Sequence, residues 1–305
     1  MEKIDKELLE QVAGLHETPK GAYNIRKNSE SAGRQSTANI EITSKEDKPG
    51  IDITIKPGTK NESVHIPVLI TETGVSEMVY NDFYIGEDSD VLIVAGCGIH
   101  NSGDSESKHD GIHRFFVKKG AKLRYVEKHY GSGDGNGKRV MNPATELYME
   151  EDSVCEMEMV QIKGVDSTVR TMTADLGKNA KLTVTERLMT HGSQLARSDM
   201  EILLNGENAS AQIISRSVGR DSSEQIFNPI AVGNNACRAH IQCDSIIMDD
   251  SKIRSIPEIA ANHKEAQIVH EAAIGRINGD QLLKLQTLGL TAEEAEKVII
   301  DGFLK

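Results

Sequence analysis

The sequence predicts a mainly β fold: a right-handed parallel β-helix, or β-solenoid, with a short N-terminal helix and strand region and a C-terminal helical tail. Apolar and polar residues alternate over many short segments, which is the period of a β-strand. A similar corner also recurs, as in Ile85–Ser89 and Val117–Ala121, where an apolar residue precedes turn formers and a small residue. The second residues of these corners lie at positions 86, 118, 150, 177, 206 and 233, which are 27 to 32 residues apart.

A repeat of this length, built only from short strands, is typical of stacked coils. Further turn signals at Gly164, Gly192 and Gly219 divide the later units, so each coil is expected to hold two or more strands. A β-sandwich of hairpins is the alternative. It gives no reason for one corner to recur with Ala or Ser at the same position, and the solenoid is therefore favoured.

Residues 1–74 are predicted to form an N-terminal region with one helix and short strands. Apolar residues such as Leu8 and Val12 follow helical spacing, and the turn formers of Thr18–Gly21 end the pattern. The later part alternates between apolar and polar residues, as in Val64–Ile70. A helix followed by strands is therefore expected before the first complete coil.

The β-helix core is predicted over residues 75–275, and a helical tail over residues 276–305. Within the core, the run Gly131–Lys138 has the composition of a phosphate-binding loop, but Lys138 is followed by Arg139 where that loop needs Ser or Thr. A flexible loop protruding from the solenoid is expected instead.

The tail is predicted to contain two short amphipathic helices. Leu282, Leu285 and Leu288 lie on one side of the first, and Gly289 supplies its stop. Thr291–Glu294 has the pattern of a capping box that begins the second helix. Such helices can cap the open end of a solenoid or form a docking surface, and the residue pattern alone leaves both alternatives open.

Charge and composition exclude several classes of function. The chain carries 35 Lys and Arg against 47 Asp and Glu, a net charge of −12, which disfavours binding to nucleic acid or anionic lipid. Its longest apolar runs, such as Val91–Ala95, fall far short of the roughly 20 residues that cross a bilayer. Four dispersed cysteines suit a reducing compartment, and we expect a cytoplasmic protein.

The cysteines differ in their surroundings. Cys97 lies between two glycines, which leave its thiol less shielded and suit sulfur chemistry, although a corner that needs glycine geometry explains them equally well. Cys237 and Cys243 share one face of a strand and are about 20 Å apart, so they are not expected to bind one metal ion together. His240 faces the other way. Cys155 is expected in the core.

His270 and Glu271 are adjacent in a predicted strand, so their side chains leave on opposite faces. One of them must point towards the interior or an interface, where an unpaired charge is costly. A structural salt bridge is the simplest expectation for Glu271.

Several segments, taken in order, resemble the SufB/SufD family of iron–sulfur cluster assembly proteins. In the C-terminal part these are Gln242–Ser245, Ile256–Glu258, Val269–Gly275, Asp280–Leu282, Gly289–Thr291 and Gly302–Phe303. In the centre they are Val94–Cys97, Gly111–His113 and Phe116–Tyr125. The resemblance covers residues 75–305, and it implies a scaffold that carries a transient iron–sulfur cluster and has no enzymatic activity of its own.

The resemblance also implies site residues. Cys97 matches the cysteine that accepts sulfur as a persulfide, and Cys243 matches the cysteine that holds the nascent cluster. Glu271 matches a carboxylate near that cysteine, and His270 a histidine used in subunit pairing. A thiolate and a carboxylate suit this chemistry, because thiolate is the preferred ligand of iron–sulfur clusters and a carboxylate binds iron exchangeably.

The implied partners are a SufC-like ABC-type ATPase, a sulfur donor (a cysteine desulfurase or sulfide), and a second copy of the chain or a SufB/SufD paralogue. The chain resembles the compact relatives, so a homodimer is expected. Residues expected to dock the ATPase are Gln281, Leu282, Leu285, Leu288, Val298, Ile299 and Phe303.

Two other functions are alternatives to the scaffold. One is a SufD-like structural partner that supports the ATPase without holding a cluster. The other is a β-helix enzyme acting on polysaccharide, which the absence of Trp disfavours. The sequence leaves open the involvement of a flavin and the roles of several side chains, namely Cys237, His240, His100, His109 and His113.

Overall fold

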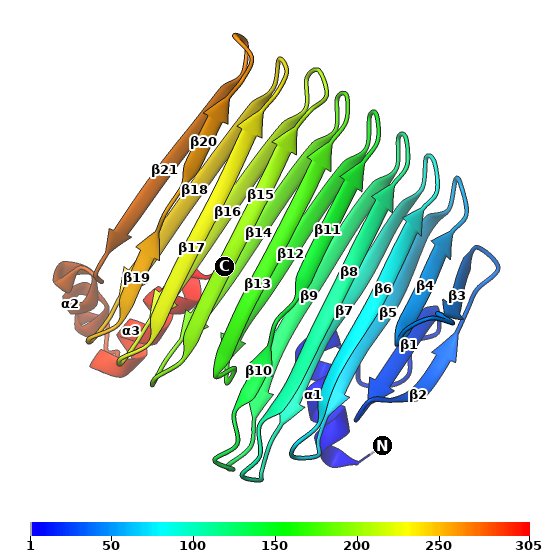
Figure 1. The fold of residues 1–305 in the computed structure, drawn as a ribbon. Helices are drawn as coiled ribbons and strands as arrows, with labels where there is room; N and C mark the ends of the chain where they lie inside the picture. The colour runs from blue at the N-terminus through cyan, green and yellow to red at the C-terminus, as the bar shows by residue number, and fades with distance from the viewer. Residues whose placement is uncertain (1) are drawn as a thin grey trace.

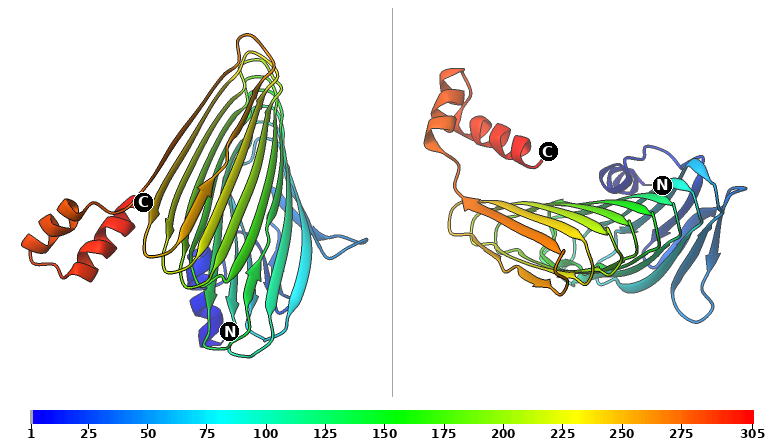
Figure 2. Two further views of the ribbon diagram at one scale, coloured as in Figure 1. Left: turned by 60° about the vertical axis from the view of Figure 1, so that its left-hand side comes forward. Right: turned by 90° about the horizontal axis from the view of Figure 1, so that it is seen from above.

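The computed structural model describes residues 2–305 and shows a flattened parallel β-solenoid (Figure 1). The chain passes alternately through two stacked sheets, and each strand pairs with the strand one coil before it and one coil after it. The view from above in Figure 2 shows the two layers and the helices that lie outside them. The predicted β-solenoid with helices at both ends is confirmed.

The first coils follow helix α1 (Lys3–Ala13). Their strands are β1 (Ala22–Lys27), β2 (Glu30–Gln35), β3 (Ile40–Ser44), β4 (Gly50–Ile55) and β5 (Lys60–Ile70). Strands β1 and β2 pair antiparallel, as do β3 and β4, whereas β1 pairs parallel with β5 and β4 with β6. The two antiparallel hairpins therefore form the N-terminal edges of the two sheets.

The remaining strands build the two parallel sheets. They are β6 (Ser76–Ile85), β7 (Asp90–His100), β8 (Ser107–Val117), β9 (Lys122–Ser132), β10 (Arg139–Met141), β11 (Ala144–Met149), β12 (Val154–Lys163), β13 (Ser167–Leu176), β14 (Lys181–Thr190), β15 (Leu195–Leu204), β16 (Ser210–Gly219), β17 (Glu224–Gly233), β18 (Arg238–Ile247), β19 (Lys252–Ser255), β20 (Glu258–Ala261) and β21 (Gln267–Gly275). The first sheet has the order β2-β1-β5-β7-β9-β12-β14-β16-β18-β21, and the second runs from β3 and β4 through β17 to β19.

The recurring corner has a physical cause. Asp88, Asp152, Asn179 and Asn208 occupy it with φ values of 54 to 59°, a left-handed conformation that Asp and Asn tolerate better than other side chains. The small residue that follows is enclosed between stacked coils, and Ala180, for example, is fully buried. A larger side chain would push the coils apart, which explains why Ala or Ser recurs there.

The loop at Gly131–Lys138 joins β9 to β10 and stacks on the loop of the preceding coil. A Cβ at Gly133 would lie 2.2 Å from the Asn101 carbonyl oxygen, and one at Gly137 would lie 2.1 Å from that of Ser105. The backbone amide of Gly137 also donates to the Gly103 carbonyl at 2.9 Å. The glycines therefore permit close packing of two backbones.

The core between the sheets is apolar along one half of each coil and polar along the other. Phe83 and Phe115 stack with their ring centroids 4.4 Å apart in the apolar half, and Tyr125 packs edge-on against Phe115. Towards the other end of the same strands the inward positions are occupied by ionisable side chains, as at Glu77 and Glu127. This polar half of the core contains the candidate site.

The tail forms helices α2 (Gly279–Thr287) and α3 (Ala292–Phe303). The predicted capping box is present, since the Glu294 amide donates to Thr291 Oγ1 at 3.2 Å and the Thr291 amide donates to Glu294 Oε2 at 2.8 Å. Ile300 packs on Val218 of β16, so α3 lies against the outer face of the first sheet. Within residues 2–305, no helix is both long enough and apolar enough to span a bilayer.

Candidate functional site

Cys243 and His270 meet inside the last coil of the first sheet. Cys243 lies on β18 and His270 on the neighbouring strand β21, and both side chains project to the interior. Cys243 Sγ is 3.2 Å from His270 Nε2, and only 3% of the cysteine is exposed. A thiol and an imidazole at this separation are two good ligands for a transition metal.

Glu271 lies on the opposite face of β21 from His270. Its side chain is 66% exposed, and its Oε2 is 3.4 Å from Nε2 of His240, which projects outward from β18. The predicted separation of His270 and Glu271 onto two faces is therefore observed, and His270 is the inward one. Within a single chain, strand alternation keeps Glu271 away from the Cys243 thiol.

The protein interior keeps both inward groups of this pair neutral at pH 7. Burial, together with the charges of Glu186 and Asp244, raises the pKa of Cys243 to about 11, although the nearby Ser255 hydroxyl opposes the shift. Burial, assisted by His240, lowers the pKa of His270. Metal binding at Cys243 must therefore displace the thiol proton.

Cys97 lies in the middle of β7 and is only 1% exposed. The expectation that its flanking glycines leave the thiol less shielded is wrong. They instead admit helix α1, because a Cβ at Gly96 would lie 2.9 Å from the Val12 carbonyl oxygen and one at Gly98 would lie 3.0 Å from a methyl of Leu8. The helix covers the outer face of β7 while the thiol faces the core.

A small cavity of about 20 Å³ lies beside Cys97 in the polar half of the core. Three histidines line it, namely His109, His113 and His129. His129 is the neighbour of Cys97 in the β7–β9 register, whereas His109 and His113 come from β8 on the opposite sheet. The sequence left His109 and His113 without a role, and the fold places both at the predicted sulfur acceptor.

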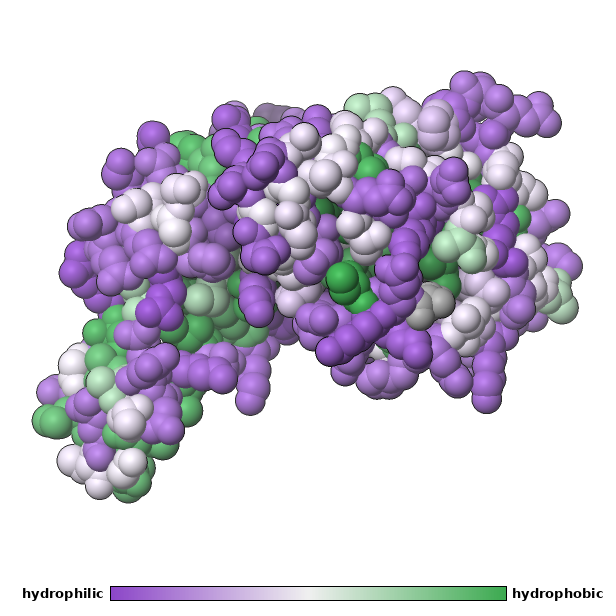
Figure 3. Space-filling model, turned by 90° about the horizontal axis from the view of Figure 1, so that it is seen from below, coloured by the Kyte–Doolittle hydropathy of each residue, from purple (hydrophilic) through white to green (hydrophobic). Residues whose placement is uncertain are grey.

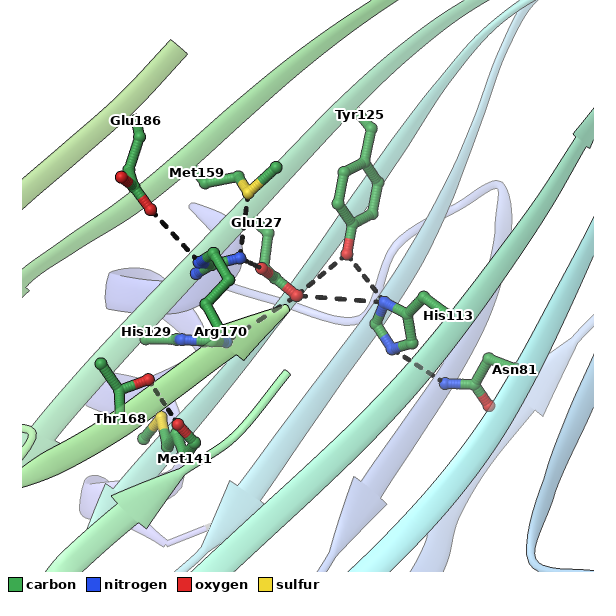
Figure 4. Close-up of polar contacts among 10 residues, drawn as sticks. All are labelled: Asn81, His113, Tyr125, Glu127, His129, Met141, Met159, Thr168, Arg170 and Glu186. Atoms are coloured by element: carbon green, nitrogen blue, oxygen red, sulfur yellow. Dashed lines mark hydrogen bonds and ion pairs between the residues drawn. The ribbon is translucent and has the colours of Figure 1, made fainter. Parts of the chain in front are cut away.

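A buried ion chain continues from this cavity through the core (Figure 4). Arg170 of β13 lies between two carboxylates: it is hydrogen-bonded to Glu127 of β9, and its Nε is 3.6 Å from an oxygen of Glu186 on β14. On the other side of Glu127, Tyr125 Oη donates to the carboxylate at 3.1 Å and lies 2.8 Å from Nδ1 of His113.

The ion chain keeps its charges although it is buried. Burial alone would raise the pKa of Glu127, but the positive charge of Arg170 and the polar contacts of His129 and His113 hold it well below the ordinary value. Burial lowers the pKa of His113 and His129 to about 4 each, so both imidazoles are neutral at pH 7.

Glu186 connects the buried ionisable side chains Glu127 and Arg170 to the cavity at Cys243. Its carboxylate accepts hydrogen bonds from Ser198 Oγ at 3.0 Å and from Ser215 Oγ at 3.3 Å. Glu186, Ser198 and Ser215 also line the small cavity that contains Cys243. The two cysteines singled out from the sequence therefore lie at two positions along one polar row, which we define as His129, Glu127, Arg170, Glu186 and Ser215.

Comparison with known proteins identifies the family. The sequence model described as "SUF system FeS cluster assembly, SufBD core domain" matches residues 70–303. The chain belongs to the SufBD family. It is 27% identical to an iron–sulfur cluster assembly SufBD family protein of Methanocaldococcus jannaschii over 98% of this chain and 96% of the relative.

Other SufBD relatives match over much of their length. The protein is 29% identical to a SufBD family protein of Archaeoglobus fulgidus, covering 85% of this chain and 69% of the relative. It is 27% identical to one of Methanothermobacter thermautotrophicus, covering 84% of this chain and 62% of that longer relative. The family assignment and the predicted resemblance agree.

In this SufBD protein, no three His, Cys, Asp or Glu side chains among residues 2–305 are arranged to hold one metal ion. Cys243 and His270 are a pair rather than a complete ligand set. Cys155 and Cys237 lie in the apolar core, as expected for packing roles. The His100 ring nitrogens lie 3.0 Å from the hydroxyls of Ser132 and Ser102.

The three charged members of the polar row, Glu127, Arg170 and Glu186, were not predicted from the sequence. The sequence does contain a sign that Glu127 is buried, because the alternation that places Leu123 and Tyr125 inside also places Glu127 and His129 inside. Charged residues in the inward phase of a buried strand indicate a paired interior network. Their partners come from other coils and could not be assigned by spacing.

Proposed function

We propose that this SufBD protein is a scaffold on which an iron–sulfur cluster is assembled as cargo. The proposal depends chiefly on the pairing of Cys243 with His270 at 3.2 Å in the last coil of the solenoid. Thiolate and imidazole are both ligands of iron–sulfur centres. Because β21 is the last strand of its sheet, cargo bound there lies beside an edge of the molecule.

A second copy of the chain supplies the missing ligands. Two side chains do not complete the coordination of iron, and the terminal strands expose apolar residues that a partner can cover. Val269 on β21 is 51% exposed, and Ile259 on β20 is also exposed. Glu271 of the second copy binds the cluster held by Cys243 of the first. Within one copy, Glu271 can reach the cluster only after its contact with His240 is broken.

Sulfur enters at Cys97 and leaves at Cys243. The support is the polar row, which reaches from the cavity beside Cys97 to the cavity that contains Cys243. The source proposed for Cys97 is the persulfide sulfur of a cysteine desulfurase, whereas sulfide is the alternative source for direct cluster assembly at Cys243. Passage along the row needs local opening, since the individual cavities are small.

The helical tail docks a SufC-like ATPase. Helix α2 has no buried residue, and Leu288 and Val298 are 75% and 50% exposed. Figure 3 shows hydrophobic residues gathered on the projecting tail. Ile300, in contrast, anchors α3 to the solenoid. The expected docking residues thus divide into an exposed set around Leu288 and Val298 and a half-buried set around Phe303.

Anaerobic reconstitution with iron and sulfide, in the presence of the ATPase, tests the scaffold. The wild type should take up iron and sulfide and develop charge-transfer absorption in the visible region. Cys243→Ser should lose most of this absorption, and His270→Ala should lose part of it. Cys237→Ser is the matched control, because Cys237 is equally buried directly before β18, whereas Cys243 is the cysteine that meets His270.

Equal, low iron uptake by the wild type and Cys243→Ser would contradict the scaffold. The SufD-like role, in which the protein supports the ATPase without holding a cluster, would then be the better account.

A further inference from the structure

We propose that His109, oriented by Glu77, is the base that accepts the thiol proton of Cys97 when this cysteine takes a sulfur atom from a persulfide donor. The inference rests on the proposed role of Cys97 as the sulfur acceptor. His109 then provides the route by which the buried Cys97 thiol becomes a nucleophile.

The cavity beside Cys97 provides space for one incoming atom. Its volume of about 20 Å³ suits a single water-sized group. Gly111 creates this space, because a Cβ there would lie 3.2 Å from His109 Nε2 and 3.3 Å from His113 Nε2. Cys97 and His109 both line this small volume, from opposite sheets.

The carboxylate of Glu77 orients His109. The distance from His109 Nδ1 to Glu77 Oε1 is 3.0 Å, and Arg26 binds the other oxygen of the same carboxylate at 3.0 Å. Burial by itself would raise the pKa of Glu77, but His109 and Arg26 hold it at about 2, so the carboxylate only accepts hydrogen bonds. In its neutral form His109 therefore carries its proton on Nδ1, and the lone pair of Nε2 lies beside Gly111.

The two other histidines of the cavity are less suited to this role. His113 Nε2 is 3.2 Å from the Asn81 amide, and its Nδ1 is engaged with Tyr125, so both nitrogens are already hydrogen-bonded. His129 has a pKa of about 4, because burial disfavours its charged form, and is a weak base. Its Nδ1 is buried without a hydrogen-bond partner, and the S–H group of a new persulfide can supply one.

Cys97 needs such a base. Burial, with the charges of Glu77 and Glu127, raises its pKa well above the ordinary value, so the thiol is protonated at pH 7, whereas the nucleophile is the thiolate. A histidine held by a carboxylate is a common means of activating a cysteine. Here Cys97 and His109 line one cavity, and Glu77 orients the histidine.

The reaction balances without an oxidant. As Cys97 Sγ attacks the outer sulfur of a donor persulfide, R–S–SH, its proton passes to His109 Nε2. The S–S bond of the donor breaks, and the donor leaves as the thiolate R–S⁻, which takes the proton from His109. The products are R–SH and the persulfide of Cys97, so one sulfur atom moves and no net electrons are exchanged.

The test uses cysteine persulfide as the donor and the full-length protein as the acceptor. The rate of sulfur transfer to Cys97 is followed by alkylation and mass spectrometry of the peptide that contains it. His109→Gln should lower the maximal rate by about 100-fold, the lower part of the range for general-base catalysis. Glu77→Gln should lower it less, without a change in the donor concentration that gives half the maximal rate. His65→Gln, a partly buried histidine that does not line the cavity, should transfer at the wild-type rate.

Gly111→Ala tests the cavity itself, because it keeps both the Cys97 thiol and the His109 imidazole while its methyl group, 3.2 Å from His109 Nε2, takes up part of the space. Its methyl group should occupy the space of the incoming sulfur and slow transfer by at least about tenfold, while the thermal melt shows that the protein remains folded. Transfer at the wild-type rate in either His109→Gln or Gly111→Ala would overturn the inference. If the wild type itself gains no sulfur at Cys97, both the inference and the proposed sulfur entry fail, whereas the cluster role of Cys243 is judged by reconstitution alone.

Discussion

At the scale of single residues, the ionisable side chains of the interior determine one another's charge. Glu127 remains a carboxylate because Arg170 pairs with it, and Arg170 is shared with Glu186. Removing one partner from a buried pair leaves an uncompensated charge, which destabilises a protein by about 3 to 5 kcal/mol. The polar row is therefore sensitive both to substitution and to acid.

Acid should destabilise the protein between about pH 6.5 and pH 4. Burial lowers the pKa of His113 and His129 from 6.5 to about 4, so only the unfolded chain binds these protons in that interval. The stabilisation is complete above pH 6.5 and is lost as pH falls towards 4, by roughly 3 kcal/mol per histidine at the limit. Urea unfolding at a series of pH values measures this loss.

His129→Gln should reduce the acid dependence of the unfolding free energy. His16→Gln, which changes an exposed histidine beyond α1, is the control and should unfold with the wild-type pH dependence. An unchanged slope in His129→Gln would show that this imidazole does not titrate in the expected range.

Part of the candidate site could be predicted from the sequence, because the alternation of side chains along a strand is a local property. Strand alternation correctly placed His240 on the face opposite Cys243, and His270 and Glu271 on opposite faces. Which of the last two faces the core depends on the register of β21 against β18, and the sequence does not contain that information. Arg170 and Glu186 escaped notice because the partner of a charged residue one or two coils away is set by three-dimensional stacking.

At the scale of elements, the two terminal helical segments lie against the same sheet but have different surroundings. Helix α1 is sealed onto β7 through Leu8 and Val12, both buried. Helix α2 has no buried residue, and α3 is attached through Ile300. The first therefore protects the strand that carries Cys97, whereas the second segment leaves an apolar surface available.

Weakening α1 should make Cys97 more reactive. Leu8→Ala removes the side chain that packs on Gly98 and should cost about 2 to 5 kcal/mol, as for other buried leucines. Local opening of β7 then increases, and alkylation of Cys97 under native conditions should accelerate several-fold, as measured by peptide mass spectrometry. Leu283→Ala, an exposed leucine of α2, should leave the rate unchanged. Equal rates in both variants would contradict a protective role of α1.

Charges on the exposed side of the tail should abolish ATPase docking without unfolding the protein. The double substitution Leu288→Asp and Val298→Asp affects two side chains that contribute little to the native core. We expect loss of co-purification with the SufC-like ATPase and a melting temperature within a few degrees of the wild type. Binding that survives these substitutions would show that the ATPase docks elsewhere.

At the scale of the whole molecule, the two ends of the solenoid differ. At the N-terminal end both sheets finish in antiparallel hairpins, with β2 and β3 as the edge strands, whereas the C-terminal edges are the strands β19, β20 and β21. Exposed strand edges favour pairing with another chain. The overall architecture could be predicted because its corner is repeated along the sequence, but the unequal ends are visible only once the strand order is known.

Val269→Lys should weaken self-association, because it places a charge on the outer face of the last strand. Light scattering over a range of protein concentrations should show a shift from dimer towards monomer. Val169→Lys is the matched control, since Val169 is similarly half-exposed but lies on β13 within the second sheet. The same dimerisation constant in both variants would place the subunit interface away from β21.

The one-sided pairing of β21 also has a consequence for local stability. In a solenoid each coil is stabilised only by its immediate neighbours, so the terminal coil unfolds with a smaller free energy than the coils between two others. Amide hydrogens of β21 should therefore exchange with solvent faster than those of β12 or β14. Because His270 lies on β21 and Cys243 on the strand beside it, the proposed cluster site can loosen and re-form while the remaining coils stay intact.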